Sequence, residues 1–254
     1  MSSISTITRL PRAAIIPSPA VLLPTLNRLI AACPSDVYDR LRPNLIPVTL
    51  SFGDIMCEAG AEQEFAYFPA GAVVSFLLTT TDQGVSAEVG TVGNDGVVGT
   101  CLFLGGRSAV GRAMVQIGGP AFKVRASVLL SEFSKGGALQ RTLLRYVQAF
   151  LSQVSQIAVC NRVHSAEKRL CRWLLLTQDR AKTDHLSLTQ EFIANLLGTR
   201  RESVTIAAAR LQDAGLIHYS RGNIHVLNRA GVELAACECY RTVTSEYERL
   251  LGCH

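Results

Sequence analysis

The side chains with the clearest chemical purpose stand close together between residues 200 and 205. Two guanidinium groups and a carboxylate come first, in Arg200, Arg201 and Glu202, and hydroxyl groups follow in Ser203 and Thr205. An arginine can donate two hydrogen bonds to one guanine, and a glutamate can accept one from cytosine. Guanidinium and hydroxyl groups also contact phosphates. This set of residues predicts contact with the major groove of a nucleic-acid duplex.

These side chains need a rigid element that presents them to the groove. The sequence pattern of Leu188–Leu211 predicts two short helices joined by a tight turn, and the second helix carries them. Thr189 is the expected N-cap of the first helix and a candidate DNA contact. Gly198 is expected to end this helix, because glycine tolerates the positive φ of a helix stop. The second helix is expected to start at Thr199 or the residue after it, with capping-box spacing between Thr199 and Glu202. The pattern predicts a helix-turn-helix motif.

A plain helical hairpin inside a larger core is the alternative for the same stretch. Such a hairpin has no use for two arginines at the start of its second helix, so the helix-turn-helix is favoured. A β-hairpin is then expected, with strands over 216–219 and 224–227. Arg221 lies in its turn, as a phosphate contact or as an ordinary solvated residue. One more amphipathic helix is expected over Ala230–His254.

Charge and cysteine usage fit a nucleic-acid partner and a reducing compartment. The net charge is +5, and residues 165–230 hold ten Lys and Arg against six Asp and Glu. The eight cysteines form no regular framework, so we expect reduced thiols and a cytoplasmic protein. The apolar run 13–26 is broken by prolines and too short to span a bilayer, so no membrane partner is expected. Residues 1–25 are expected to form a flexible arm.

The residue pattern of the chain changes twice before the helix-turn-helix, first to a β-type pattern and then to a helical one. Short β-type runs alternate with glycine turns from Ile46 onward, which predicts a small antiparallel roll or jelly roll over 26–137. From 138 to 164 the apolar period becomes helical and follows a heptad seam (Leu143, Val147, Phe150, Val154, Ile157, Asn161 and His164). Such a helix either packs on the roll or pairs with its copy, and we expect it to pair in a homodimer, because helix-turn-helix proteins usually read two half-sites as dimers. Residues 165–254 then form the winged helix-turn-helix domain, and the fold class is α+β.

This order of parts resembles the Crp/Fnr family of bacterial transcription regulators. The resemblance is carried by Tyr67-Phe68-Pro69, Gly93 to Gly99, Glu167–Arg180, Leu188–Gly198, Arg201-Glu202-Ser203-Val204 and Leu211–Ile217. It implies a sequence-specific regulator in which Arg201 and Glu202 read base edges and Ser203 contacts phosphate. Double-stranded DNA and RNA polymerase are the implied partners. Ile206 stands where many members have a second base-reading arginine, and Arg200 stands where many have a small capping residue.

The resemblance also implies an effector site in the roll, for which three chemistries compete. Gly99, Arg107 and Ser108 resemble the cassette that holds a cyclic phosphate, but Thr100 replaces the ribose-binding glutamate, so the site is expected to be degenerate. An iron–sulfur cluster needs several close thiolates, and only Cys33 lies in the N-terminal region where oxygen-sensing members carry one. A thiol or metal site is the third candidate.

That third candidate depends on two groups of residues far apart in the sequence. Cys160 and His164 are four residues apart on one helix, and Cys237-Glu238-Cys239 and Cys253-His254 come near the end. Two such pairs could build a zinc site. However, no complete four-ligand spacing is present, so we expect buried structural thiols, no metal and no cofactor.

An enzyme and an architectural DNA-binding protein are the two further function classes. An enzyme is not expected, because no nucleophile–base pair or paired carboxylates occur at a recognisable catalytic spacing. An architectural DNA-binding protein is the alternative function. It would use the same basic surface without a base preference, so the ratio of specific to non-specific affinity distinguishes it from a regulator.

Overall fold

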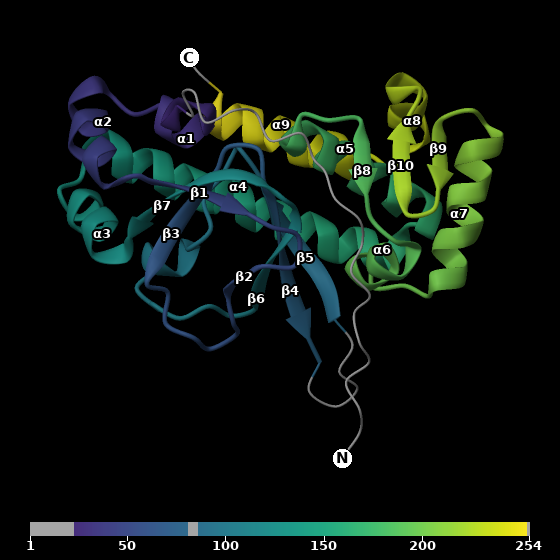
Figure 1. Cartoon of the computed structure of the whole chain (residues 1–254), viewed down its shortest axis with the longest axis horizontal. Helices are drawn as coiled ribbons and strands as arrows, with labels where there is room; N and C mark the ends of the chain where they lie inside the picture. The colour runs from purple at the N-terminus through teal and green to yellow at the C-terminus, as the bar shows by residue number, and fades with distance from the viewer. Residues whose placement is uncertain (1–22, 81–85, 253–254) are drawn as a thin grey trace.

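The computed structural model describes residues 23–80 and 86–252, and it has the α+β architecture that the sequence predicts. A roll of antiparallel strands packs against the long helix α4 (Gly137–Val163), and a helical domain with a small sheet follows at one end (Figure 1). Most of the expected N-terminal arm, together with Cys253 and His254, lies outside the described residues.

The roll consists of two antiparallel sheets with an apolar interior. One sheet has the order β1 (Ile46–Leu50), β7 (Gly119–Arg125), β3 (Phe65–Pro69). The other has the order β2 (Ile55–Cys57), β6 (Arg112–Ile117), β4 (Val73–Thr79), β5 (Ser86–Val92). Phe68 and Phe122 of the first sheet and Val74 and Val115 of the second are buried. The predicted antiparallel roll is therefore present, with its apolar side chains inside as expected for two packed sheets.

Two glycines of the predicted turn series are required by helices that pack against the roll. A β-carbon at Gly96 would lie 2.6 Å from the ring of Tyr146 in α4. A β-carbon at Gly93 would lie 2.3 Å from the β-carbon of Arg180 in α5 (Ala166–Ala181). These glycines let the helices approach the sheet closely, a role that a reading of turns along the sequence does not reveal.

Helix α4 agrees with the expected helix over 138–164, but its predicted seam faces the interior of the same chain. Leu143 is 0% exposed, Val147 6% and Ile157 3%. The roll and helix α9 (Cys239–Leu251) cover this side of α4. The seam assignment was therefore wrong. A heptad pattern predicts an apolar stripe on the helix, but it does not say whether the same chain or a second copy covers that stripe.

The C-terminal half contains the predicted helix-turn-helix and wing. Its elements after α5 are β8 (His185–Ser187), α6 (Gln190–Leu196), α7 (Arg201–Asp213), β9 (Ile217–Ser220) and β10 (Asn223–Val226). The three strands form one antiparallel sheet in the order β8-β10-β9. The sequence predicted β9 and β10 to within one residue, but it did not predict β8. Trp173 of α5 is 1% exposed and belongs to the core.

The remaining short elements differ from the sequence-based expectation in two places. They are η1 (Pro24–Leu26), α1 (Arg28–Ala31), α2 (Ser35–Leu41), η2 (Arg42–Asn44), η3 (Thr100–Leu102), α3 (Ala126–Ser134) and α8 (Arg229–Ala235). Helix α3 was not predicted. The single helix expected from Ala230 is wrong, because the backbone becomes extended at Ala236, with ψ of 158°, and separates α8 from α9. No helix in the described ranges is long and apolar enough to cross a membrane.

Candidate nucleic-acid interface

The turn of the helix-turn-helix is built by hydrogen bonds at both ends of α6. The Thr189 hydroxyl accepts from the backbone N–H of Phe192 at 3.2 Å, which confirms this N-cap. At the other end Gly198 has φ of 57°, and the Thr199 N–H donates to the Ala194 carbonyl at 3.0 Å. This is the Schellman arrangement that glycine favours. The sequence therefore predicted the start and the stop of α6 correctly.

Helix α7 begins at Arg201 without a side-chain cap. Its N-cap is Arg200, whose side chain makes no capping hydrogen bond, so the capping box expected between Thr199 and Glu202 is not formed. The inward face of the helix is apolar, because Val204, Ala208 and Leu211 are buried. Packing on α5 and α6, rather than an N-terminal capping box, holds α7 in place.

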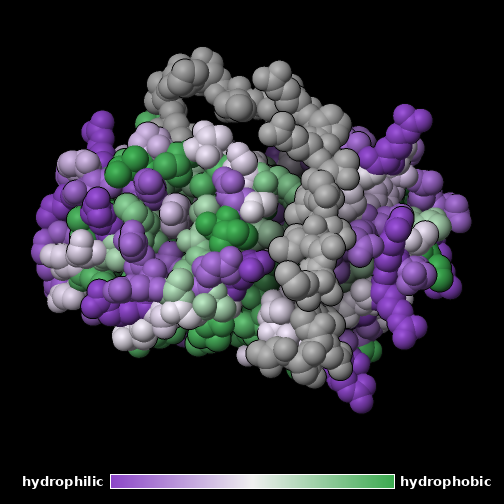
Figure 2. Space-filling view, turned by 60° about the horizontal axis from the view of Figure 1, so that its bottom comes forward, coloured by the Kyte–Doolittle hydropathy of each residue, from purple (hydrophilic) through white to green (hydrophobic). Residues whose placement is uncertain are grey.

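The first turn of α7 presents unpaired charged groups to solvent. Arg200, Arg201 and Glu202 are exposed, and none of them forms an ion pair with another described residue. Ser203 is half-buried and Thr205 is exposed. Figure 2 shows hydrophilic side chains projecting from the end of the molecule where Figure 1 places α7 and the wing. Because these guanidinium groups have no carboxylate partner there, they remain available for phosphates and base edges.

The wing places one more arginine at an exposed tip. Arg221 has φ of 48° and Gly222 has φ of 80°, as a two-residue type I′ turn requires, and Asn223 pairs with Ser220 across it. Positive φ is uncommon for a residue with a β-carbon. The turn geometry directs the strands, and the Arg221 side chain is left exposed.

The helix-turn-helix and the wing meet at the start of α6. A β-carbon on Gly222 would lie 3.7 Å from Thr189, so the wing tip lies beside the α6 N-cap. The Thr205 hydroxyl of α7 lies 2.8 Å from Oε1 of Gln190, the first residue of α6. The structure thus brings Thr189, Thr205 and the wing tip together from three segments of the chain.

The comparisons with known proteins identify this arrangement. Residues 168–234 match the Crp-like helix-turn-helix domain. This part of the chain is therefore a helix-turn-helix domain of the Crp type. A helix-turn-helix of this type is a DNA-binding element. No curated protein matches the sequence.

Solved structures with the same architecture are distant in sequence. FixK2 from Bradyrhizobium japonicum has 18% identity and a TM-score of 0.65, over 76% of this chain and 98% of that chain. A putative Crp/Fnr-family regulator from Eubacterium rectale has 17% identity and a TM-score of 0.64, over 83% and 98%. TTHB099, a CRP-family regulator from Thermus thermophilus, has 17% identity and a TM-score of 0.62, over 74% and 96%. These structures share the fold of this chain.

The residues expected to hold a cyclic phosphate are engaged in local contacts. Arg107 has φ of 58°, and its guanidinium lies 2.7 Å from the Glu62 carboxylate at the surface. The Ser108 hydroxyl donates to the Gly106 carbonyl at 3.4 Å. Gly99 has φ of 119° and precedes the short helix η3. Glycine is favoured at this position because it adopts a positive φ without steric cost.

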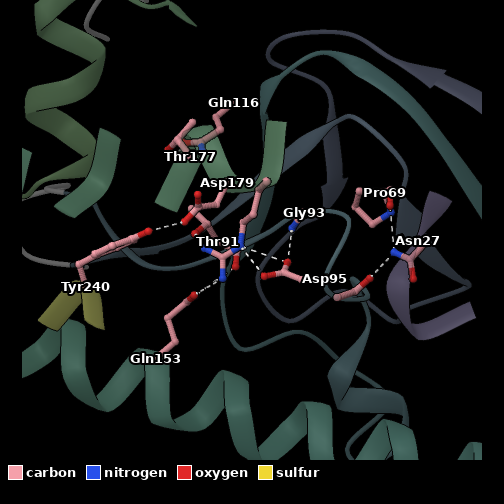
Figure 3. Close-up of polar contacts among 12 residues, drawn as sticks. Asn27, Pro69, Thr91, Gly93, Asp95, Gln116, Gln153, Thr177, Asp179 and Tyr240 are labelled. Carbon is pink, nitrogen blue, oxygen red and sulfur yellow. Dashed lines mark hydrogen bonds and ion pairs between the residues drawn. The ribbon is translucent and has the colours of Figure 1, made fainter. Parts of the chain in front are cut away.

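A buried polar network that the sequence did not reveal joins the roll to α5. Arg180 Nε donates to both carboxylate oxygens of Asp95 at 3.1 Å. Its Nη1 and Nη2 donate to Thr91 Oγ1 and Gln153 Oε1, each at 2.6 Å. Figure 3 shows Thr91, Asp95 and Gln153 converging from the roll and α4. Sequence spacing gives no signal for such a network, because its members come from three distant elements.

Proposed function

We propose that the regulator binds a two-fold-symmetric DNA site as a homodimer, with α7 of each subunit in a major groove. The observation that carries this proposal is the unpaired, exposed first turn of α7 on a helix whose opposite face is buried. Arg201 donates to guanine and Glu202 accepts from cytosine in this proposal. The supporting contacts to phosphate come from Thr189, Arg200, Ser203, Thr205 and Arg221.

The proposed homodimer uses the outer face of α4. Leu144 and Leu151 are seven residues apart and are 45% and 55% exposed, and exposed Ala158 continues the row seven residues further on. Val159 beside it is 56% exposed. This row is displaced by one residue from the seam predicted from the sequence. Heptad spacing of apolar residues on an uncovered helix face supports pairing with the same helix of a second copy.

The proposed regulator does not use its roll to bind cyclic nucleotides. Thr100 lacks the carboxylate that would accept from a ribose hydroxyl, and Arg107 is already paired with Glu62. A structural neighbour, the global regulator CLP of Xanthomonas campestris, is described as c-di-GMP responsive. At 16% identity that likeness extends to the fold and not to the effector. RNA polymerase is the further partner proposed for a regulator acting at promoters.

Selection of preferred sites from random DNA tests the base-reading role. We compare the wild type with Arg201→Ala and with Arg210→Ala, a control at the far end of α7 whose guanidinium lies 3.4 Å from Glu167. Arg201→Ala should lose about 1–3 kcal/mol on the preferred site and the preference for one guanine. Arg210→Ala should keep that preference. A wild type that selects no sequence supports an architectural protein, and an unchanged preference in Arg201→Ala contradicts the assignment.

A further inference from the structure

Four ligand-type side chains gather where α4 meets the break between α8 and α9. Cys160 lies in the last turn of α4, and His164 is the C-cap of the same helix. Cys237 lies in the break, and Cys239 is the first residue of α9. Their sulfur and ring nitrogen atoms all lie within 4.8 Å of one another, and the three cysteines are buried. Two sequence pairs that looked incomplete thus form one set of four.

The distances within this set fit a single tetrahedral ion. Zinc binds thiolate sulfur at about 2.3 Å and imidazole nitrogen at about 2.0 Å, which places two ligands of one ion roughly 3.5–3.8 Å apart. The Sγ atoms of Cys160 and Cys237 are 3.6 Å apart. The Cys239 Sγ atom and the His164 Nδ1 atom are 3.5 Å apart. These two measured pairs therefore match edges of a tetrahedron.

The groups around the four ligands are those that a metal site needs. The His164 Nε2 atom lies 3.4 Å from a carboxylate oxygen of Glu238, which favours the tautomer with a free Nδ1 lone pair. The Gln156 amide Nε2 donates to Cys239 Sγ at 3.1 Å. Such a donor stabilises a thiolate and orients it toward the ion.

Charge near the cluster has the sign that bound thiolates require. One divalent ion with three thiolates and a neutral imidazole carries a net charge of about −1. The side chains of Arg169 and Arg172 are buried nearby and attract a Cys160 thiolate, and the Nε atoms of both have no hydrogen-bond partner among the described residues.

Two cysteines outside this four-residue set are isolated thiols. Burial raises the pKa of Cys33 to about 11 and that of Cys171 to about 12. Neither belongs to the four-residue set. A buried, isolated thiol of this kind behaves as a small apolar side chain. The chain therefore contains its own controls for a metal-binding experiment.

We propose that Cys160, His164, Cys237 and Cys239 bind one zinc ion in a closed Cys3His site. All four positions of the tetrahedron are filled by protein, so the site is structural rather than catalytic. The ion bridges the end of α4 and the start of α9, beside the His164–Ser165 joint where α4 passes into α5. It thereby fixes the DNA-binding domain to the helix proposed to form the dimer.

Metal content of the full-length protein, purified under reducing conditions, is the first test. The wild type and Cys171→Ser should each contain about one zinc per chain, and Cys237→Ser less than about one-tenth. Equal metal content in Cys237→Ser, iron in place of zinc, or a metal-free wild type would each overturn the proposal.

Cobalt supplies a test that does not depend on a destabilised variant. Metal-free wild type titrated with Co2+ should develop the intense visible bands of a tetrahedral site and thiolate-to-cobalt charge transfer. His164→Cys should still bind cobalt, with charge transfer stronger by roughly a third because four thiolates replace three. A weak octahedral spectrum in the wild type, or no binding by His164→Cys, contradicts the ligand assignment.

Hydrogen exchange tests the bridging role. Removing zinc should raise amide exchange by at least about tenfold over residues 157–165 and 236–243, while the strands of the roll stay protected. Exchange that is unchanged at both segments would contradict a structural bridge between α4 and α9.

Discussion

The Arg180 guanidinium of the DNA-binding half reaches across to the roll and binds the Asp95 carboxylate through its Nε at 3.1 Å. The Arg180 side chain is 3% exposed and that of Asp95 is 15% exposed. A β-carbon at Gly93 would collide with Arg180, so the neighbouring glycine makes room for this contact. The two halves of the regulator are therefore joined by a desolvated ion pair as well as by apolar packing.

Breaking this ion pair should destabilise the protein strongly. In Asp95→Ala the buried Arg180 charge loses its counter-ion, and the expected loss in free energy of unfolding is about 3–5 kcal/mol. Chemical denaturation measures the loss. Asp184→Ala is the matched control, because the Asp184 side chain is 60% exposed and faces His225 at the surface. That control should lose far less stability, because solvent screens a surface ion pair. Equal losses in both variants would refute the interpretation.

Buried Glu88 should give the regulator a pH-dependent stability. Burial raises the pKa of Glu88 to about 7, although the Ser75 hydroxyl donates to its carboxylate at 2.6 Å and the charges of Arg172 and Arg180 oppose the shift. The folded state therefore holds this proton longer than the unfolded chain does. Stability from this group is complete below about pH 4 and is lost as pH rises to about 7.

The variant Glu88→Gln allows the contribution of Glu88 ionisation to stability to be measured. Between pH 4 and 8 the wild type should lose about 3 kcal/mol of unfolding free energy relative to Glu88→Gln, which cannot ionise. Glu62→Gln is the control, since Glu62 lies at the surface beside Arg107. It should follow the wild-type profile. A Glu88→Gln profile parallel to the wild type would show that folding leaves the pKa of Glu88 unchanged.

Local signals in the sequence were sufficient for most elements of the DNA-binding half. Thr189, Gly198 and the turn at Arg221 act through hydrogen bonds and backbone angles within a few residues, so their effect can be predicted from neighbouring positions. The capping box failed because Thr199 is used to close the preceding turn, where its N–H donates to Ala194. A residue at such a junction fits the sequence pattern of two motifs, the end of one helix and the cap of the next, but in the structure it can form only one of them.

Features that depend on distant segments were missed for a different reason. The α4 seam was placed one residue away from the exposed row, because both stripes have helical period and only packing distinguishes them. The four ligands looked incomplete because Cys237 and Cys239 reach Cys160 only through the break before α9. Three-dimensional contact, rather than residue type, decides both cases.

The outer face of α4 should control the oligomeric state. Leu151→Glu places two like charges near each other in the proposed symmetric interface and should shift the protein from dimer to monomer at micromolar concentration. Light scattering gives the mass. Val110→Glu introduces the same charge at a residue of the roll that is 87% exposed, and this variant should stay dimeric. An unchanged mass for Leu151→Glu would remove this face from the interface.

Cyclic nucleotides should not act on the regulator. A missing ribose carboxylate at Thr100 removes a charge-assisted hydrogen bond, which is about 1.5–3 kcal/mol of binding energy. Titration calorimetry with cyclic AMP and cyclic GMP should detect no binding tighter than about 100 μM. Micromolar binding accompanied by a gain in DNA affinity would mean that the roll holds the nucleotide through other residues.

The wing tip allows stability to be separated from DNA binding. Arg221→Gly removes the positive-φ strain of the turn, so the variant should be at least as stable as the wild type. It also removes one proposed phosphate contact, so affinity should fall for all DNA sequences alike and the salt slope should decrease by about 0.9. Lys182→Gly is the matched control, because Lys182 is a basic residue with φ of 54° at the end of α5, away from the wing. It should relieve the same strain without changing the salt slope. An unchanged slope in Arg221→Gly would show that the wing tip does not contact phosphate, whereas a lost base preference would assign it to direct readout.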